Sequence, residues 1–140
     1  MSKTEPRFVP FGEAFNNFFK GYVVWKGRAT RAEYWWIQLV NTIISIVPYV
    51  GIAWGLATLL PGISVTVRRL HDTSRSGFWY LGIFGGLIAG IILTAVGGAA
   101  KEAALIALGL IAILACGITS IVLMCLPSTP CKNKYGELRK

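Results

Sequence analysis

The residues best suited to chemistry form one run in the middle of the chain. Segment 67–79 reads Val-Arg-Arg-Leu-His-Asp-Thr-Ser-Arg-Ser-Gly-Phe-Trp, and it holds the single histidine and the single aspartate of the sequence. His71 beside Asp72 suggests acid/base chemistry, but adjacent residues on a helix do not face each other, so they are not a ready-made dyad. Three arginines lie four, three and three residues from Asp72, and on a continuing helix its carboxylate can accept a hydrogen bond from any of them. These arginines are Arg68, Arg69 and Arg75.

Two interpretations of these charges remain open. A planar guanidinium suits phosphate, so the arginines are candidates for binding anionic headgroups or another phosphate-bearing ligand. The candidate set is Arg28, Arg31, Arg68, Arg69 and Arg75. Alternatively, the charges hold the helix ends together, in a structural network of Glu33, His71 and Asp72. Asp72 is then the acceptor that fixes the helices relative to one another.

The sequence shows no pattern typical of a catalytic, cofactor or metal site. It has no G-x-S-x-G serine and no glycine-rich loop with phosphate-binding spacing. The three cysteines, Cys116, Cys125 and Cys131, show no metal-ligand spacing. We therefore expect no catalytic residue, no metal, no cofactor and no enzyme activity.

The elements that position the central run are strongly apolar. The chain of 140 residues is 54% hydrophobic and 14% charged, whereas soluble domains carry roughly 25% charged residues. This composition predicts a membrane protein. The formal net charge of +8 favours an anionic partner, and acidic lipid headgroups are the nearest such surface. The sequence has no groove-reading motif, so nucleic acid is not expected.

The lengths of the apolar segments predict four membrane spans. Residues 35–67 carry no formal charge, and a single helix of that length would be about 50 Å long against a hydrocarbon core near 30 Å. A reversal is therefore expected at residues 48–51. The predicted spans are about 31–47, 51–71, 77–97 and 103–126. The predicted fold is an all-α membrane protein with four transmembrane helices in an antiparallel bundle, forming a single membrane domain over residues 11–137.

Shorter signals predict how the segments begin and pack. Thr30 and Glu33 have capping-box spacing at the start of the first span. Aromatic residues recur on one face of residues 11–22, which predicts an N-terminal amphipathic helix that lies at the membrane interface or packs on the body of the protein. Glycines at 82, 86 and 90 predict close approach of another helix. Residues 1–10 are expected to be a flexible tail and residues 127–140 a basic cytoplasmic tail.

The distribution of basic residues predicts the orientation. With four spans, thirteen of the fourteen lysines and arginines fall on one side, and only Lys101 falls on the other. The positive-inside rule makes the basic side cytoplasmic. Both termini are therefore expected in the cytoplasm of a bacterial cell, with a multi-pass protein in its inner membrane.

Three motifs resemble the bacterial inner-membrane family known as domain of unknown function 805. They are Gly27-Arg28-Ala29-Thr30-Arg31 with Glu33-Tyr34-Trp35, then Arg68 to Trp79, and Asn133-Lys134-Tyr135-Gly136. The similarity runs from about residue 20 to 137. The chain departs from the usual pattern at Ser74, Phe78, Lys134 and the pair Cys131-Lys132. The resemblance implies a small multi-pass inner-membrane protein and no activity.

The predicted role is interaction at the membrane. We expect a membrane-interaction or scaffold protein whose basic cytoplasmic face contacts anionic lipid or a partner protein, with a homo-oligomer as one form of partnership. The alternative is a small oligomeric transporter or channel. Apart from their ends, the spans carry no charged residue, so they provide no evident proton or ion relay for transport.

Overall fold

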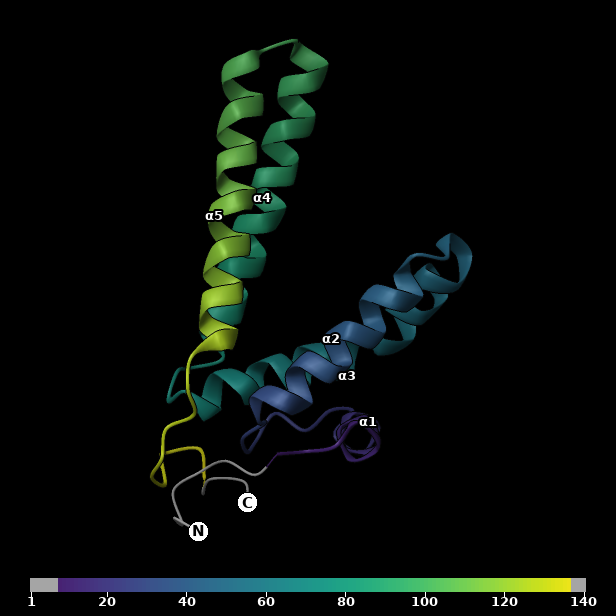
Figure 1. The fold of residues 1–140 in the computed structure, drawn as a ribbon. Coiled ribbons are helices and arrows are strands. Elements are labelled where there is room, and N and C mark those ends of the chain that lie inside the picture. The colour runs from purple at the N-terminus through teal and green to yellow at the C-terminus, as the bar shows by residue number, and fades with distance from the viewer. Residues whose placement is uncertain (1–7, 137–140) are drawn as a thin grey trace. The chain divides into compact units, whose positions relative to one another are not determined.

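The structure is a computed structural model that describes residues 8–136, and in this part of the chain it is all α-helical. The five helices are α1 (Phe11–Lys20), α2 (Arg31–Ser45), α3 (Pro48–Asp72), α4 (Phe78–Ala100) and α5 (Ala103–Cys125) (Figure 1). They form two compact units, one with α1, α2, α3 and the segment after α5, the other with α4 and α5. Most of the tail expected at residues 1–10 lies outside the described residues, but Val9 is buried.

Helix α1 packs on its own unit through one aromatic face. Phe18 is only 2% exposed. The ring of Phe11 meets Trp36 of α2 edge-on at 5.6 Å, and the ring of Phe19 meets Trp54 of α3 at 6.2 Å. Edge-to-face pairs at these distances add to the energy of apolar burial. The aromatic residues whose spacing predicts this helix thus pack against α2 and α3.

Helix α2 begins at the capping box that the sequence predicts. The Thr30 hydroxyl accepts from the Glu33 backbone N–H at 3.2 Å, and the Glu33 carboxylate accepts from the Thr30 N–H at 3.0 Å. These bonds satisfy two of the donors that every helix start leaves without a partner in the helix. The prediction of this helix start is confirmed.

The reversal between α2 and α3 lies slightly earlier than expected, at Ile46 and Val47. Pro48 occupies the first turn of α3, where its missing N–H costs nothing and its fixed φ suits a helix. A Cβ at Gly51 would lie 2.9 Å from the Ser45 Cα, so this glycine allows the two helices to approach closely. Beyond the turn, the Trp54 indole donates to the Asn41 side chain at 2.9 Å.

The α4–α5 unit is a helical hairpin packed through glycines. A Cβ at Gly86 would clash with Cys116, and one at Gly90 would lie 2.9 Å from the Gly109 carbonyl oxygen. The predicted close approach is therefore found at two of the three glycines of the G-x-x-x-G face. At Gly82 an added Cβ would meet no atom within 4 Å. The hairpin turns at Lys101, which has a positive φ of 58°.

Three helices, α3, α4 and α5, are long and apolar enough to cross a membrane. Helix α2 has 15 residues, which corresponds to about 22 Å against a hydrocarbon core of about 30 Å. It ends early because the turn before Pro48 breaks the helix that the apolar sequence would otherwise continue. The structure therefore gives three helices of spanning length where the sequence predicts four.

Candidate functional site

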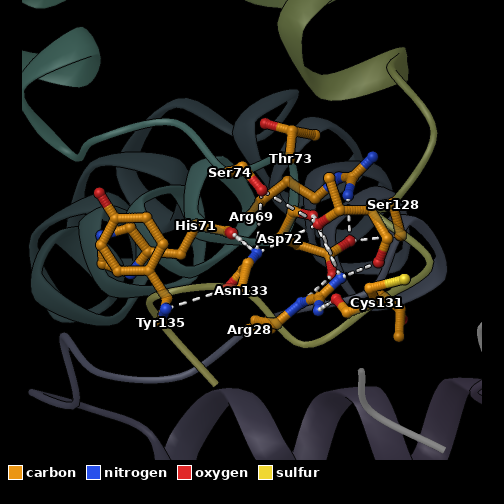
Figure 2. A network of polar contacts seen from close by, with 12 residues as sticks. Arg28, Arg69, His71, Asp72, Thr73, Ser74, Ser128, Cys131, Asn133 and Tyr135 are labelled. Atoms are coloured by element: carbon orange, nitrogen blue, oxygen red, sulfur yellow. Dashed lines mark hydrogen bonds and ion pairs between the residues drawn. The ribbon is translucent and has the colours of Figure 1, made fainter. Parts of the chain in front are cut away.

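The carboxylate of Asp72 is the centre of a buried polar network at the end of α3 (Figure 2). Arg28 Nε donates to Oδ1 at 2.7 Å, and Arg69 Nη1 donates to Oδ2 at 2.5 Å. The side chains of all three residues are at most 2% exposed. The Ser128 hydroxyl also donates to Oδ2. One carboxylate thus joins the segment before α2, the last turn of α3 and the segment after α5.

The two arginines also hold the backbone of the segment after α5. Arg28 Nη2 donates to the Thr129 carbonyl oxygen at 2.6 Å, and Nη1 donates to the Cys131 carbonyl oxygen at 3.0 Å. Arg69 Nη2 donates to the Leu126 carbonyl oxygen. Charged hydrogen bonds of this kind are stronger than neutral ones. They fix residues 126–131 against the end of α3.

The same segment satisfies the carbonyl groups that the end of α3 leaves exposed. The backbone N–H of Thr129 donates to the Asp72 carbonyl oxygen at 3.0 Å, and its hydroxyl donates to the same oxygen at 2.8 Å. The Asn133 amide donates to the His71 carbonyl oxygen at 2.8 Å. Side chains from a distant segment therefore cap this helix. We call Arg28, Arg69, Asp72, Ser128, Thr129 and Asn133 the Asp72 network.

Beyond the network, the segment ends in a small turn that places an aromatic ring on His71. Tyr135 stacks on the His71 imidazole with centroids 3.8 Å apart and an interplanar angle of 8°. Asn133 and Gly136 exchange two backbone hydrogen bonds of 3.0 Å. Gly136 has a φ of 137°, which only glycine adopts easily. His71 therefore packs on Tyr135 while Asp72 faces the arginines.

A second buried cluster surrounds Glu33. Its carboxylate accepts from the Thr30 backbone at 3.0 Å and from the Asn17 amide at 2.9 Å, which links α2 to α1. Nearby, the backbone N–H of Ala29 donates to the Arg68 carbonyl oxygen at 3.1 Å. Glu33 is only 3% exposed. Both carboxylates at this end of the unit are thus enclosed by donors.

The predicted site residues fall into two groups. Arg28, Arg69 and Arg68 are buried, at 4%, 0% and 7% exposure, and the first two use their guanidinium groups on Asp72. Arg69, one of the three arginines near Asp72 in sequence, forms an ion pair with it. The Arg68 guanidinium lies against the backbone at Gly21. Arg31 is exposed and Arg75 is half-buried.

Sequence reasoning missed the partners that lie far away in the chain. Arg28 is 44 residues from Asp72, and Ser128 is 56 residues from it, so no local spacing connects them. The roles of Thr129 and Asn133 were missed for the same reason. One signal in the sequence points to them: the run Asn133 to Gly136 matches a family motif although it stands in a polar tail. Residues 127–136 pack on the end of α3.

Comparison with known proteins places the chain in a family. The family model described as "Protein of unknown function (DUF805)" matches residues 45–137. Inner membrane protein YhaI of Escherichia coli (strain K12) is 40% identical over 86 residues, which cover 53% of this chain and 73% of the relative. Inner membrane protein YhaH of the same strain is 37% identical over 78 residues, 44% of this chain and 64% of the relative. No solved structure matches the chain.

The family match spans α3, α4, α5 and the segment that completes the Asp72 network. The three helices able to cross a membrane agree with the relatives' description as inner membrane proteins. The chain therefore belongs to the DUF805 family, a family of inner membrane proteins whose function is unknown.

Proposed function

We propose that the protein is a membrane-interaction protein whose basic cytoplasmic surface binds anionic lipid headgroups. This basic surface consists of the exposed cations of the first unit. Its members are Lys20, Lys26, Arg31, Lys132 and Lys134. In this proposal the Asp72 network is a structural anchor, and the surface around it makes the contact with lipid.

The observation that carries the proposal is the contrast between buried carboxylates and exposed cations. Asp72 and Glu33 are 1% and 3% exposed, and both are enclosed by donors of the protein itself. Both carboxylates are therefore already occupied by donors inside the protein, whereas the lysines lie on its surface. A surface with this imbalance attracts acidic lipid, at about 1 kcal/mol for each lysine or arginine near the headgroups.

The Asp72 network keeps much of the basic surface together. Arg28 binds the Cys131 carbonyl oxygen, so the segment that carries Lys26 lies next to the segment that carries Lys132. The Gly21 backbone packs on Arg68, which brings the end of α1 toward the end of α3. In this proposal the cations act together near the start of α2 and the end of α3.

The proposal includes four spans, with α2 as the shortest. Helix α2 runs back along α3 after a turn of two residues. Its length of about 22 Å can be accommodated by local thinning of the bilayer and by aromatic residues at the interface. Tyr34, Trp35 and Trp36 stand in its first two turns. Helix α1, with exposed Phe11 and Phe19, is then proposed to lie at the cytoplasmic interface.

The test compares the thermal stability of the purified protein in neutral vesicles and in vesicles containing phosphatidylglycerol. We expect acidic lipid to raise the melting temperature, and added salt to reduce the gain because exposed charges are screened. Replacing Lys26, Lys132 and Lys134 together with glutamine should remove most of the gain. Lys101→Gln, in the turn between α4 and α5, should leave it intact. Equal melting temperatures in both lipids would rule out the proposal.

A further inference from the structure

A groove on helix α2 has the form of a site for one lipid acyl chain. It has a volume of about 500 Å³. Most of its wall is apolar, and most of the lining residues lie along one face of the helix. The lining residues are Phe8, Ala32, Trp35, Trp36, Gln38, Leu39 and Thr42. Leu39 is 50% exposed and Trp35 is 41% exposed, so the described part of the chain leaves the groove open.

The length of the groove matches one leaflet of a bilayer. From Ala32 to Thr42 the helix advances ten residues, or about 15 Å. Half of a hydrocarbon core of about 30 Å is also about 15 Å. An acyl chain that enters at the start of α2 would therefore reach the end of the groove near the middle of the bilayer.

Two polar groups along the groove, the Thr42 hydroxyl and the Gln38 side-chain oxygen, bond within the helix. The Thr42 hydroxyl donates to the Gln38 carbonyl oxygen at 2.8 Å, and the Gln38 side-chain oxygen accepts from Asn41 at 3.3 Å. The wall therefore offers little that a polar ligand could use. An apolar acyl chain therefore suits this wall better than a polar ligand, whose polar groups would be buried there without hydrogen bonds.

A cation stands at the end of the groove where a headgroup would lie. Arg31 is the first residue of α2 and is exposed. At about 100° per residue it falls on the same face of the helix as Trp35, Gln38 and Thr42. Its neighbour Glu33 is buried and accepts from Thr30 and Asn17. The guanidinium is thus placed to meet an anion, and a phosphate diester suits its planar donors.

We infer that the α2 groove binds one anionic glycerophospholipid, with an acyl chain along residues 32–42 and the phosphate on Arg31. The inference rests on the proposed placement of α2 in the membrane, but it does not depend on the lysines of the basic surface. The inference adds one specific lipid-binding site to the general attraction of the basic surface for acidic lipid.

The test is photolabelling in reconstituted vesicles. The protein is placed in phosphatidylcholine vesicles that contain a trace of either phosphatidylglycerol or phosphatidylcholine with a diazirine in one acyl chain. After illumination, labelled peptides are measured by mass spectrometry. We expect the acidic probe to label residues 32–42 about fivefold more than the neutral probe. Both probes carry the phosphate diester, but in phosphatidylcholine the choline cation offsets its charge, so only the acidic probe presents a net negative charge to Arg31. Labelling of α5 should not distinguish the two probes.

Matched variants separate the site from general lipid contact. Arg31→Gln should remove the preference for the acidic probe at residues 32–42. Leu39→Trp should lower labelling there by narrowing the groove. Leu110→Trp is its control, since Leu110 of α5 is 49% exposed and lies on another helix.

Three results would overturn the inference. The first is equal labelling of residues 32–42 by both probes. The second is a preference that survives Arg31→Gln. The third is an absence of lipid label there, which would mean that protein, such as a second copy of the chain, covers the groove. The variant lacking Lys26, Lys132 and Lys134 should keep the preference while losing the stabilisation by acidic lipid, so the two proposals can fail separately.

Discussion

At the scale of single residues, Asp72 carries more contacts than its position at a helix end suggests. Its carboxylate accepts from Arg28, Arg69 and Ser128, and its backbone carbonyl accepts from Thr129. Two guanidinium groups around one carboxylate leave a net positive charge at the end of α3. Removing the carboxylate charge would leave both arginines buried without an anion, which is more costly than losing one hydrogen bond.

We therefore expect Asp72→Asn to destabilise the protein strongly. Breaking a buried ion pair by removing one partner typically costs about 3–5 kcal/mol. The measurement is the thermal melting temperature in detergent, with the oligomeric state checked by size-exclusion chromatography. Lys101→Gln removes an exposed charge from the α4–α5 turn and should melt with the wild type. If Asp72→Asn also melts with the wild type, Asp72 is not the anchor.

A second residue-scale prediction concerns Asn133. Its amide donates to the His71 carbonyl oxygen at 2.8 Å, so Asn133→Ala should loosen the segment after α5 by about 1–2 kcal/mol. Trypsin should then cut faster after Lys132 and Lys134. Thr119→Ala is a suitable control, since that hydroxyl bonds only within its own helix, to the Ala115 carbonyl oxygen. Unchanged cleavage would mean that the amide does not hold the segment.

Residue-scale prediction from sequence succeeded where partners are close in the chain. The capping box of Thr30 and Glu33 and the pairing of Arg69 with Asp72 each involve a spacing of three residues, which a helix brings together. The pairing of Arg28 with Asp72 depends on how distant segments fold together. No periodicity in the sequence encodes it.

At the scale of helices, glycines determine how closely α4 and α5 approach. A Cβ at Gly109 would lie 2.6 Å from the Gly90 carbonyl oxygen and 2.7 Å from the Thr94 backbone nitrogen. Both atoms belong to the helix backbone, so a side chain cannot move aside to relieve the clash. The two helices would have to separate.

Gly109→Ala should therefore destabilise the hairpin by about 1–3 kcal/mol, the usual cost of overpacking. Gly117→Ala is the matched control on the same helix, because a Cβ there meets nothing within 4 Å. It should be neutral or slightly stabilising, since alanine is the better helix former. Chemical or thermal unfolding in detergent measures both. Equal effects of the two substitutions would show that the close contact is absent.

Helix boundaries were predicted well where a local signal sets them. Pro127 and Pro130 follow the end of α5, one residue from the predicted boundary. The start of α3 was predicted three residues too late, because Pro48 was assigned to the turn and instead occupies the first turn of the helix. The length of α2 was overestimated by two residues, because the apolar sequence continues through the turn at Ile46 and Val47. Apolar residues alone cannot mark a turn that lies within a membrane-length segment.

At the scale of the whole molecule, the positions of the charges argue for one orientation. The Asp72 network and the basic surface belong to the first unit, whereas Lys101 and Glu102 form the turn of the α4–α5 hairpin. In the proposed arrangement of four spans, thirteen basic residues share one side, and we expect that side to be cytoplasmic by the positive-inside rule. If α2 spans the bilayer, the segment before α2 and the segment after α5 share that side.

The measurement that tests this account most directly is the accessibility of two thiols in whole cells. Cys131 is exposed in the segment after α5, and Lys101→Cys places a thiol in the α4–α5 turn. In a variant without Cys116 and Cys125, a membrane-impermeant maleimide should label the thiol at position 101 in intact cells. It should label Cys131 only after the inner membrane is permeabilised. Labelling of Cys131 in intact cells would place the basic surface outside the cytoplasm and contradict the account.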